Sequence, residues 1–267
     1  MTSSAGPARP LAEPPTFFLH VMKTGGTTLL RHIQQNFELD EIYPHPDLDI
    51  HDGGTTAVNF LHFTLRYLCR LPPERRELIK VYVGHFPFVA LELLGGPFRT
   101  MTLLRDPVAR TISQLRQFQR PAPWAGAAAH GSAAEVRPLE EVYEDPLVFA
   151  PLVHNHQTKL FSMGVDDEPT GYMQAVDIDA SRLATALDNL ATIDAVGVTE
   201  RYDEFLGRVE AAWGWRLPRE RRANVTPLDE GPRVSDALRR RIAEDNAIDV
   251  ELYARVREGL ARASAGR

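Results

Sequence analysis

Lysine, glycine and threonine residues gather in one short stretch, HVMKTGGTT, at residues 20–28. A glycine turn that leads into a helix is typical of an anion-binding loop, because backbone N–H groups and the helix N-terminus point at the ligand. A nucleoside-triphosphatase loop runs G-x-x-x-x-G-K-[ST], with its lysine after the last glycine. Here Lys23 precedes both glycines, so we expect it at the end of a strand. In a bound nucleotide, Lys23 would then lie above the phosphate that is nearest the nucleoside. There it could neutralise a leaving group attached to that same phosphate.

The residues after Lys23 would complete this loop. Glycines let the main chain approach a ligand closely, and hydroxyl and N–H groups at a helix start can bind an anion. The predicted loop residues are Thr24, Gly25, Gly26, Thr27 and Thr28. The alternative for this stretch is an ordinary glycine turn before a helix.

A second group of polar residues lies in LLRDPVARTISQLRQF, at residues 103–118. The pattern predicts Arg105 at the carboxyl end of a strand, Pro107 at the start of a helix and Ser113 two turns into it. Open α/β sheets bind their ligands at the carboxyl ends of the strands, and a guanidinium with a hydroxyl suits a phosphate monoester. Taken singly, Arg105 could instead pair with Asp106, and Ser113 could be a surface residue.

Apolar runs alternate with helical periodicity along the chain, which predicts a single α/β domain with a central parallel sheet flanked by helices. The predicted strands are 16–22, 80–84, 100–105 and 193–199. The predicted helices are 27–37, 58–70, 107–119, 139–162 and 181–191, with a last one that starts near Ser235 and breaks near Asn246. We expect residues 1–15 to be a disordered tail, 16–262 the domain, and 120–138 a flexible insert loop, because these two segments are rich in Pro and Ala.

Composition sets further bounds. The net charge of −6 over 267 residues argues against a non-specific nucleic-acid binder. Cys69 is the single cysteine, so no intrachain disulfide can form. The opening residues lack an apolar signal region, and no apolar run reaches the length of a membrane span. We therefore expect a cytoplasmic protein without a membrane span.

Together the two polar stretches resemble the nucleotide-binding elements of sulfotransferases that use 3′-phosphoadenosine-5′-phosphosulfate (PAPS), above all the carbohydrate branch with the heparan sulfate 2-O- and 6-O-sulfotransferases. Further similar segments follow in the family's order, at residues 82–88, 155–162, 196–206, 222–227 and 246–256. The resemblance implies that residues 23–28 cradle the 5′-phosphosulfate while Arg105 and Ser113 hold the 3′-phosphate. It also implies sulfuryl transfer to a hydroxyl of a carbohydrate or small molecule, with 3′,5′-ADP as product and no metal.

The acceptor hydroxyl needs a base, and histidine has a pKa near working pH. His85 follows Gly84 at the end of a predicted strand and matches the family's catalytic histidine segment, so we predict that His85 is the base. The sequence departs from the 2-O pattern at Val83, where a histidine is usual, and from the 6-O pattern at residues 86–88, where an aspartate is usual. The alternative is that His85 packs against the two phenylalanines that follow it. His20 is predicted to be structural.

Other residues are assigned by position only. Asn224 and Thr226 are predicted to contact the nucleotide, and Lys159 stands where the family usually has arginine. The remaining histidines lack metal-ligand spacing, so no metal site is predicted.

Two other functions remain open from the sequence. A P-loop kinase would use Asp194 to hold Mg²⁺, although the chain lacks the G-K-[ST] signature. A non-catalytic nucleotide-binding protein could keep the same fold.

Overall fold

The computed structural model describes residues 13–45, 49, 65–119, 137–167, 173–218 and 234–266. Five strands form one sheet in the order β2-β3-β1-β4-β5, and every neighbouring pair is parallel. The strands are β1 (Thr16–Leu19), β2 (Ile42–Tyr43), β3 (Val81–Gly84), β4 (Arg99–Leu104) and β5 (Ala195–Val198). The predicted fold class, a parallel sheet flanked by helices, is therefore confirmed.

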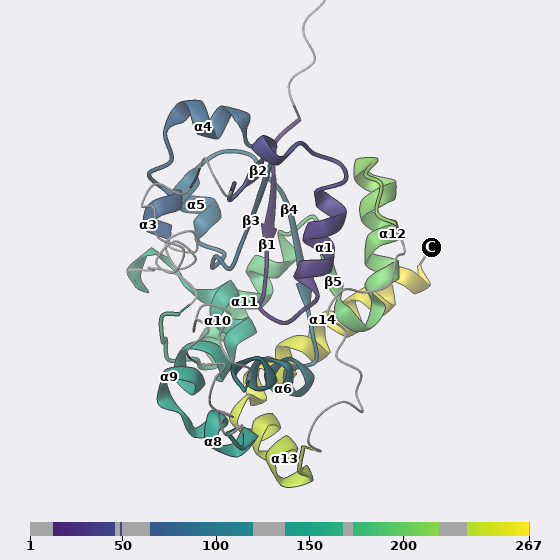
Figure 1. Cartoon of the computed structure of the whole chain (residues 1–267). Helices are drawn as coiled ribbons and strands as arrows, with labels where there is room; N and C mark the ends of the chain where they lie inside the picture. Colours follow the sequence, from purple (N-terminus) through teal and green to yellow (C-terminus); the bar gives the residue numbers. More distant parts are fainter. Residues whose placement is uncertain are drawn as a thin grey trace, which may run out of the picture.

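The described helices lie between the strands and after the last one, and most of them are short (Figure 1). They are α1 (Gly26–Ile33), α3 (Leu65–Leu68), α4 (Pro73–Leu78), α5 (Ala90–Leu94), α6 (Pro107–Phe118), α8 (Leu139–Glu144), α9 (Pro146–Val148), α10 (His156–Ser162), α11 (Ala180–Ala191), α12 (Tyr202–Trp213), α13 (Asp236–Asp245) and α14 (Ala247–Ala265). Short 3₁₀ turns lie at Leu39–Glu41, Val165–Asp167 and Thr199–Arg201, and a π-helical turn lies at Phe149–Val153.

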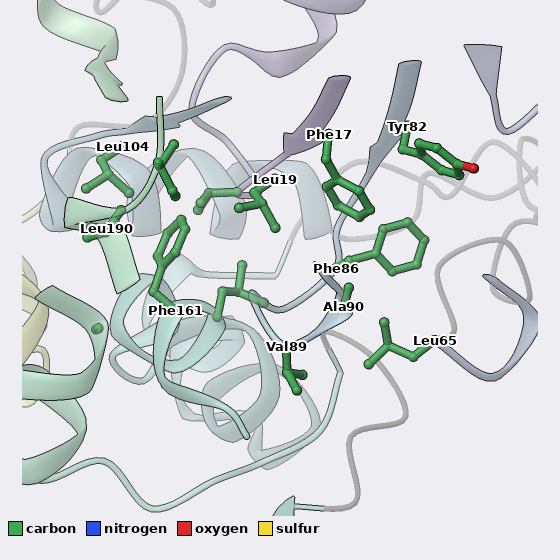
Figure 2. Packing of buried hydrophobic residues seen from close by; sticks show 14 of the residues in the cluster. Phe17, Leu19, Leu65, Tyr82, Phe86, Val89, Ala90, Leu104, Phe161 and Leu190 are labelled. Carbon is green, nitrogen blue, oxygen red and sulfur yellow. The ribbon is translucent and has the colours of Figure 1, made fainter. Parts of the chain in front are cut away.

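Helices cover both faces of the sheet. Successive side chains of a strand point to opposite faces, and here both sets are apolar, so both faces need to be covered. On one face, Phe18 of β1 packs in a buried cluster with residues of α1 and α12. On the other, Phe17 and Leu19 pack with residues of α3, α5, α10 and α11. Figure 2 shows this second cluster, in which Phe86 lies beside Phe17 and Phe161 packs near Leu190. Burial on both faces explains why the strands are mostly apolar and β-branched residues without a regular polar face.

A third buried cluster lies beyond the carboxyl ends of the strands, where α6, α8, α9 and α13 pack together (Figure 1). Ile112 and Leu115 of α6 belong to this cluster, and Ser113 lies between them in the sequence of α6. Because this cluster fixes α6, the helix that bears the predicted 3′-phosphate residue has a defined place next to the sheet.

The predicted strands at 16–22, 80–84, 100–105 and 193–199 correspond to β1, β3, β4 and β5, and the first, third and fifth predicted helices correspond to α1, α6 and α11. Ser235 caps α13 as predicted, since its side chain accepts a hydrogen bond from the N–H of Leu238 at 3.1 Å. The predicted break near Asn246 is also correct, because α13 ends at Asp245 and α14 begins at Ala247.

The prediction of one helix over 139–162 is wrong. The segment is divided into α8, α9, a π-helical turn and α10. Pro146 begins α9, and Asn155 has φ 42° before α10, so the chain cannot continue as one α-helix through these positions. Strand β2 and helices α4, α5 and α12 were not predicted. Most of the predicted tail (residues 1–12), most of the insert loop and most of the helix at 58–70 lie outside the described residues.

Candidate active site at the carboxyl ends of the strands

The loop after β1 has the predicted order of strand, glycine turn and helix. Lys23 and Gly25 both have positive φ values, 67° and 91°, a conformation that glycine adopts readily and lysine only at a cost. Helix α1 begins at Gly26. A side chain at Gly26 would meet the imidazole of His20, whose Nε2 lies 1.9 Å from the position of an added Cβ. Gly26 is therefore required for close packing against His20.

Hydrogen bonds hold this loop against the neighbouring strand ends. The hydroxyl of Thr24 donates to the carbonyl of Val21 at 2.8 Å, so its side chain stabilises the turn itself. The Thr199 hydroxyl, just after β5, lies 2.8 Å from the carbonyl of Thr24 and 3.1 Å from that of Leu104. Thr27 is exposed and Thr28 is buried, with the Thr28 N–H donating to the carbonyl of Gly25. Thr199 thus joins the loop after β1 to the ends of β4 and β5.

Arg105 lies directly after β4, at the predicted edge of the sheet. Its guanidinium donates to the carbonyl of Lys23 at 3.1 Å, so it touches the loop that follows β1. Burial lowers the pKa of Arg105, while the carboxylates of Glu200 and Asp106 raise it. Asp106 does not form the ion pair considered for it in the sequence: it caps α6, since its side chain accepts a hydrogen bond from the N–H of Ala109 at 2.8 Å.

Lys23 brings the loop to the surface of α6. Its Nζ donates to Oε1 of Gln117 at 2.8 Å. Ser113 is partly buried and lies one helical turn before Gln117, so both side chains belong to the same face of α6. The two predicted anion-binding elements therefore meet at one edge of the sheet, joined by Arg105 on one side and by Lys23 on the other.

His85 follows β3 and faces the same loop. Its Nδ1 lies 2.6 Å from the carbonyl oxygen of His20. Because a carbonyl can only accept, Nδ1 carries the proton and the lone pair of the neutral ring is on Nε2. The two imidazoles lie 4.3 Å apart between ring centroids. Burial lowers the pKa of His85 to about 4, the His20 carbonyl raises it, and the charge of Lys23 lowers it further.

The alternative considered for His85 was that it packs against the two phenylalanines that follow it. In the structure Phe86, and not His85, occupies the buried position. Phe86 is buried in the apolar cluster beneath the sheet, and Gly84 makes room for its ring. His85 is only partly buried and contacts His20 instead. Phe86 thus anchors the segment while His85 remains at the carboxyl edge of the sheet.

Asp194, the residue that a kinase would use for Mg²⁺, lies elsewhere. Its carboxylate accepts hydrogen bonds from the N–H and the hydroxyl of Thr100, at 2.7 and 3.0 Å. Thr100 is near the start of β4 and Asp194 precedes β5. Asp194 is therefore at the amino ends of the strands, opposite the glycine loop.

Some predictions fall outside this site. Asn224 and Thr226 lie outside the described residues. Lys159 is fully buried away from solvent, and its Nζ donates to the carbonyls of Pro151 and Gln174. Within the described ranges, no group of three or more His, Cys, Asp or Glu side chains is placed to hold a metal ion. None of the helices in those ranges is long and apolar enough to cross a membrane.

Sequence reasoning missed the residues that support the site, above all Thr199, Glu200 and Gln157. Each belongs to a segment that resembles the carbohydrate sulfotransferases, but local patterns carry no signal for contacts between such distant segments. Their partners become visible only once the strand order is known.

Comparison with known proteins identifies chains that are similar to this one. No family model matches the chain. The chain is 26% identical to chicken heparan-sulfate 6-O-sulfotransferase 1 over 270 residues, which cover 88% of the chain and 63% of that protein. It is 26% identical to human heparan-sulfate 6-O-sulfotransferase 2 over 88% of the chain and 43% of that protein. A shorter match to human heparan-sulfate 6-O-sulfotransferase 1 has 34% identity over 119 residues, 28% of that protein.

The chain thus matches less than two thirds of the length of each of these relatives. The matches to the chicken protein and to the second human enzyme nevertheless extend over most of this chain. The resemblance to the carbohydrate sulfotransferases is confirmed, since the chain is similar over most of its length to proteins named heparan-sulfate 6-O-sulfotransferase.

Proposed function

We propose that this chain is a PAPS-dependent sulfotransferase that moves a sulfuryl group to a hydroxyl of a carbohydrate or small-molecule acceptor. One observation carries the proposal: two predicted anion-binding elements, far apart in the sequence, meet at the carboxyl edge of a parallel sheet. Arg105 contacts the main chain of Lys23, and Lys23 reaches the face of α6 that carries Ser113. The names of the relatives support the same activity.

The donor set fits a nucleotide with two phosphate groups. The N-terminus of α1 and the ammonium of Lys23 are suited to the 5′ group, because both favour negative charge. Arg105 and Ser113 are suited to the 3′-phosphate, since a guanidinium binds phosphate through a planar set of donors. PAPS supplies an activated sulfuryl group when bound. The chain's own residues have to hold it, orient it and compensate the charge that develops on the departing phosphate.

His85 has the protonation state that a base requires. A pKa of about 4 keeps the imidazole neutral at physiological pH. The hydrogen bond from Nδ1 to the His20 carbonyl fixes the tautomer, so that Nε2 is the atom that takes the acceptor proton. A bound anion beside the ring favours the imidazolium and so raises the pKa of His85. His85 is therefore a stronger base when the nucleotide is present.

Lys23 contributes mainly electrostatic stabilisation. Its ammonium lies at the surface of the site and is hydrogen-bonded to a neutral amide, Gln117. An exposed hydrogen bond of this kind contributes little net free energy, so exchange for a phosphate oxygen is favourable. Charge placed where negative charge develops lowers the barrier without a metal ion.

The acceptor is proposed at the level of chemical class. The relatives' names indicate a glycan, and we favour a carbohydrate hydroxyl for that reason. A hydroxyl on a secondary metabolite is compatible with the same base and the same donor site.

The nucleotide site is tested by thermal unfolding with 3′,5′-ADP in buffer that contains EDTA. Because a ligand that binds only the native state stabilises it by mass action, we expect the melting temperature to rise by the same amount with and without EDTA. Adenosine 5′-monophosphate is the matched nucleotide control and should give a smaller rise. No rise at saturating 3′,5′-ADP would refute the assignment. Release of ADP from Mg²⁺–ATP would instead support a kinase, and tight binding without turnover on a broad acceptor panel would support a non-catalytic protein.

A further inference from the structure

The main chain of Arg105 is paired with a buried side-chain amide. The N–H of Arg105 donates to Oε1 of Gln157 at 3.0 Å, and Nε2 of Gln157 donates to the Arg105 carbonyl at 2.9 Å. A primary amide offers a donor and an acceptor side by side. The Gln157 side chain therefore pairs with the backbone N–H and carbonyl of Arg105, the residue after β4, much as a neighbouring strand would. Gln157 is 0% exposed and cannot reach a ligand in solvent.

Gln157 is itself fixed where the N-termini of α10 and α14 meet. The carboxylate of Asp249, in α14, accepts hydrogen bonds from the N–H groups of Gln157 at 3.0 Å and Thr158 at 2.7 Å, and from the Thr158 hydroxyl at 2.7 Å. In return, the side-chain oxygen of Asn155 accepts from the N–H of Asp249 at 3.0 Å. Each helix therefore caps the first turn of the other.

The charge of Asp249 stabilises this junction. Two helix N-termini carry partial positive charge, and a carboxylate between them offsets their mutual repulsion. Burial raises the pKa of Asp249, whereas Arg110 and the hydrogen bonds from Thr158 and Gln157 lower it. Removing the carboxylate would leave buried N–H groups without an acceptor, which is costly.

The backbone N–H of the next residue, Asp106, is held by a second set of hydrogen bonds. The N–H of Asp106 donates to Oε1 of Glu200 at 3.2 Å, and the hydroxyl of Tyr253 donates to Oε2 of Glu200 at 2.7 Å. Tyr253 lies one turn after Asp249 on α14. The same face of α14 thus supports both sides of the segment from which the Arg105 side chain extends.

We propose that Gln157 is a positioning residue for Arg105, held in place by Asp249, and that recognition of the nucleotide 3′-phosphate depends on it. The inference rests on the proposed function. Arg105 can bind a phosphate through two donors only if its backbone is correctly oriented, and a small misplacement of such a group costs much of its effect. Gln157 supplies that orientation without touching the ligand.

The test is titration calorimetry with 3′,5′-ADP and with adenosine 5′-monophosphate on the wild type, Gln157→Leu, Arg105→Ala and the double variant. We expect Gln157→Leu to lower affinity for 3′,5′-ADP by about tenfold and to leave affinity for the monophosphate unchanged. In the Arg105→Ala background, Gln157→Leu should have no further effect, since coupled residues are not additive. Arg255→Ala, an exposed substitution on α14, is the control.

The outcomes separate the two proposals. If the wild type does not prefer 3′,5′-ADP over the monophosphate, the proposed function fails. If the wild type has that preference and Gln157→Leu retains it, the positioning role is refuted and the proposed function stands. Should Gln157→Leu fail to fold, Gln157→Asn keeps the amide on a side chain one methylene shorter, which cannot reach both the N–H and the carbonyl of Arg105. A lower 3′,5′-ADP preference in Gln157→Asn supports the positioning role, and an unchanged preference refutes it.

Discussion

Gly26→Ala tests the packing between the start of α1 and the histidine pair. An added Cβ would lie 1.9 Å from Nε2 of His20, 2.1 Å from its Cδ2 and 2.5 Å from its Cε1. Gly26 does not have a positive φ, and alanine is favoured over glycine inside a helix. The substitution is therefore destabilising for a steric reason, because the added Cβ overlaps the imidazole of His20.

The magnitude follows from the space around that ring. Ordinary contact begins near 3.4 Å, so the imidazole must retreat by about 1.5 Å. It is stacked on Phe18, with 5.1 Å between ring centroids, and lies 4.3 Å from His85 on the same measure. Overpacking of this kind costs about 1–3 kcal/mol, against a gain of up to about 1 kcal/mol from helix propensity. The net loss is therefore up to about 2 kcal/mol, and for a chain of this size we expect the melting temperature to fall by up to about 8 °C.

Scanning calorimetry on three variants checks this reasoning. Gly259→Ala in α14 is the matched control, because its added Cβ meets nothing within 4 Å, and its melting temperature should stay or rise. The double variant Gly26→Ala/His20→Ala removes the overlap, so it should lose less stability than the two single changes added together. If Gly26→Ala melts at or above the wild-type temperature, the close approach of Gly26 and His20 is not what requires a glycine.

Three further predictions concern the site and its surroundings. His85→Ala should keep its affinity for 3′,5′-ADP in titration calorimetry while losing about 10²–10⁴-fold in turnover. Because the base works when neutral, wild-type kcat/KM should fall only as pH drops through about 4. Arg105→Ala should weaken 3′,5′-ADP binding by about 2 kcal/mol and Ser113→Ala by less, as titration will show; wild-type affinity in Arg105→Ala would locate the 3′-phosphate elsewhere. Burial lowers the pKa of Lys159 to about 7, so between that pH and the pKa in the unfolded chain the unfolded state binds more protons. Stability should therefore rise with pH there, by at most about 1.4 kcal/mol per unit. Urea unfolding at two pH values should show that rise in the wild type and a smaller one in Lys159→Met.

The features that could be predicted from the sequence are those decided by neighbouring residues. Four buried parallel strands are short runs of mostly apolar and β-branched residues, and α6 begins where Asp106 caps it and Pro107 occupies its first turn. Strand β2 has two residues, Ile42 and Tyr43, which is too short for any period. The division of 139–162 follows from Pro146 and the left-handed Asn155, which outweigh the helical spacing of the apolar residues around them.

In the candidate site, too, the residues that could be predicted are those decided by their neighbours in the sequence. Lys23, the glycines and Arg105 were predicted because each is next to its own strand end. That they lie together depends on the strand order, which places β1 between β3 and β4. Thr199 was not predicted because its partners, the carbonyls of Thr24 and Leu104, are backbone atoms of other segments. A hydroxyl that bonds to a backbone carbonyl leaves no trace in the residue types of its partners.

The contacts also divide the site into a fixed part and an adjustable part. The backbone at Arg105 is held by two partly buried hydrogen bonds with the side-chain amide of Gln157, which are expensive to break without replacement. The ammonium of Lys23 is held by an exposed bond to Gln117, which is cheap to exchange. A group that must bind the same 3′-phosphate throughout the reaction benefits from being preorganised. A group that must follow charge as it develops on a departing phosphate benefits from a long side chain with an easily exchanged partner. The difference in burial between the two contacts therefore matches the difference in the roles proposed for Arg105 and Lys23.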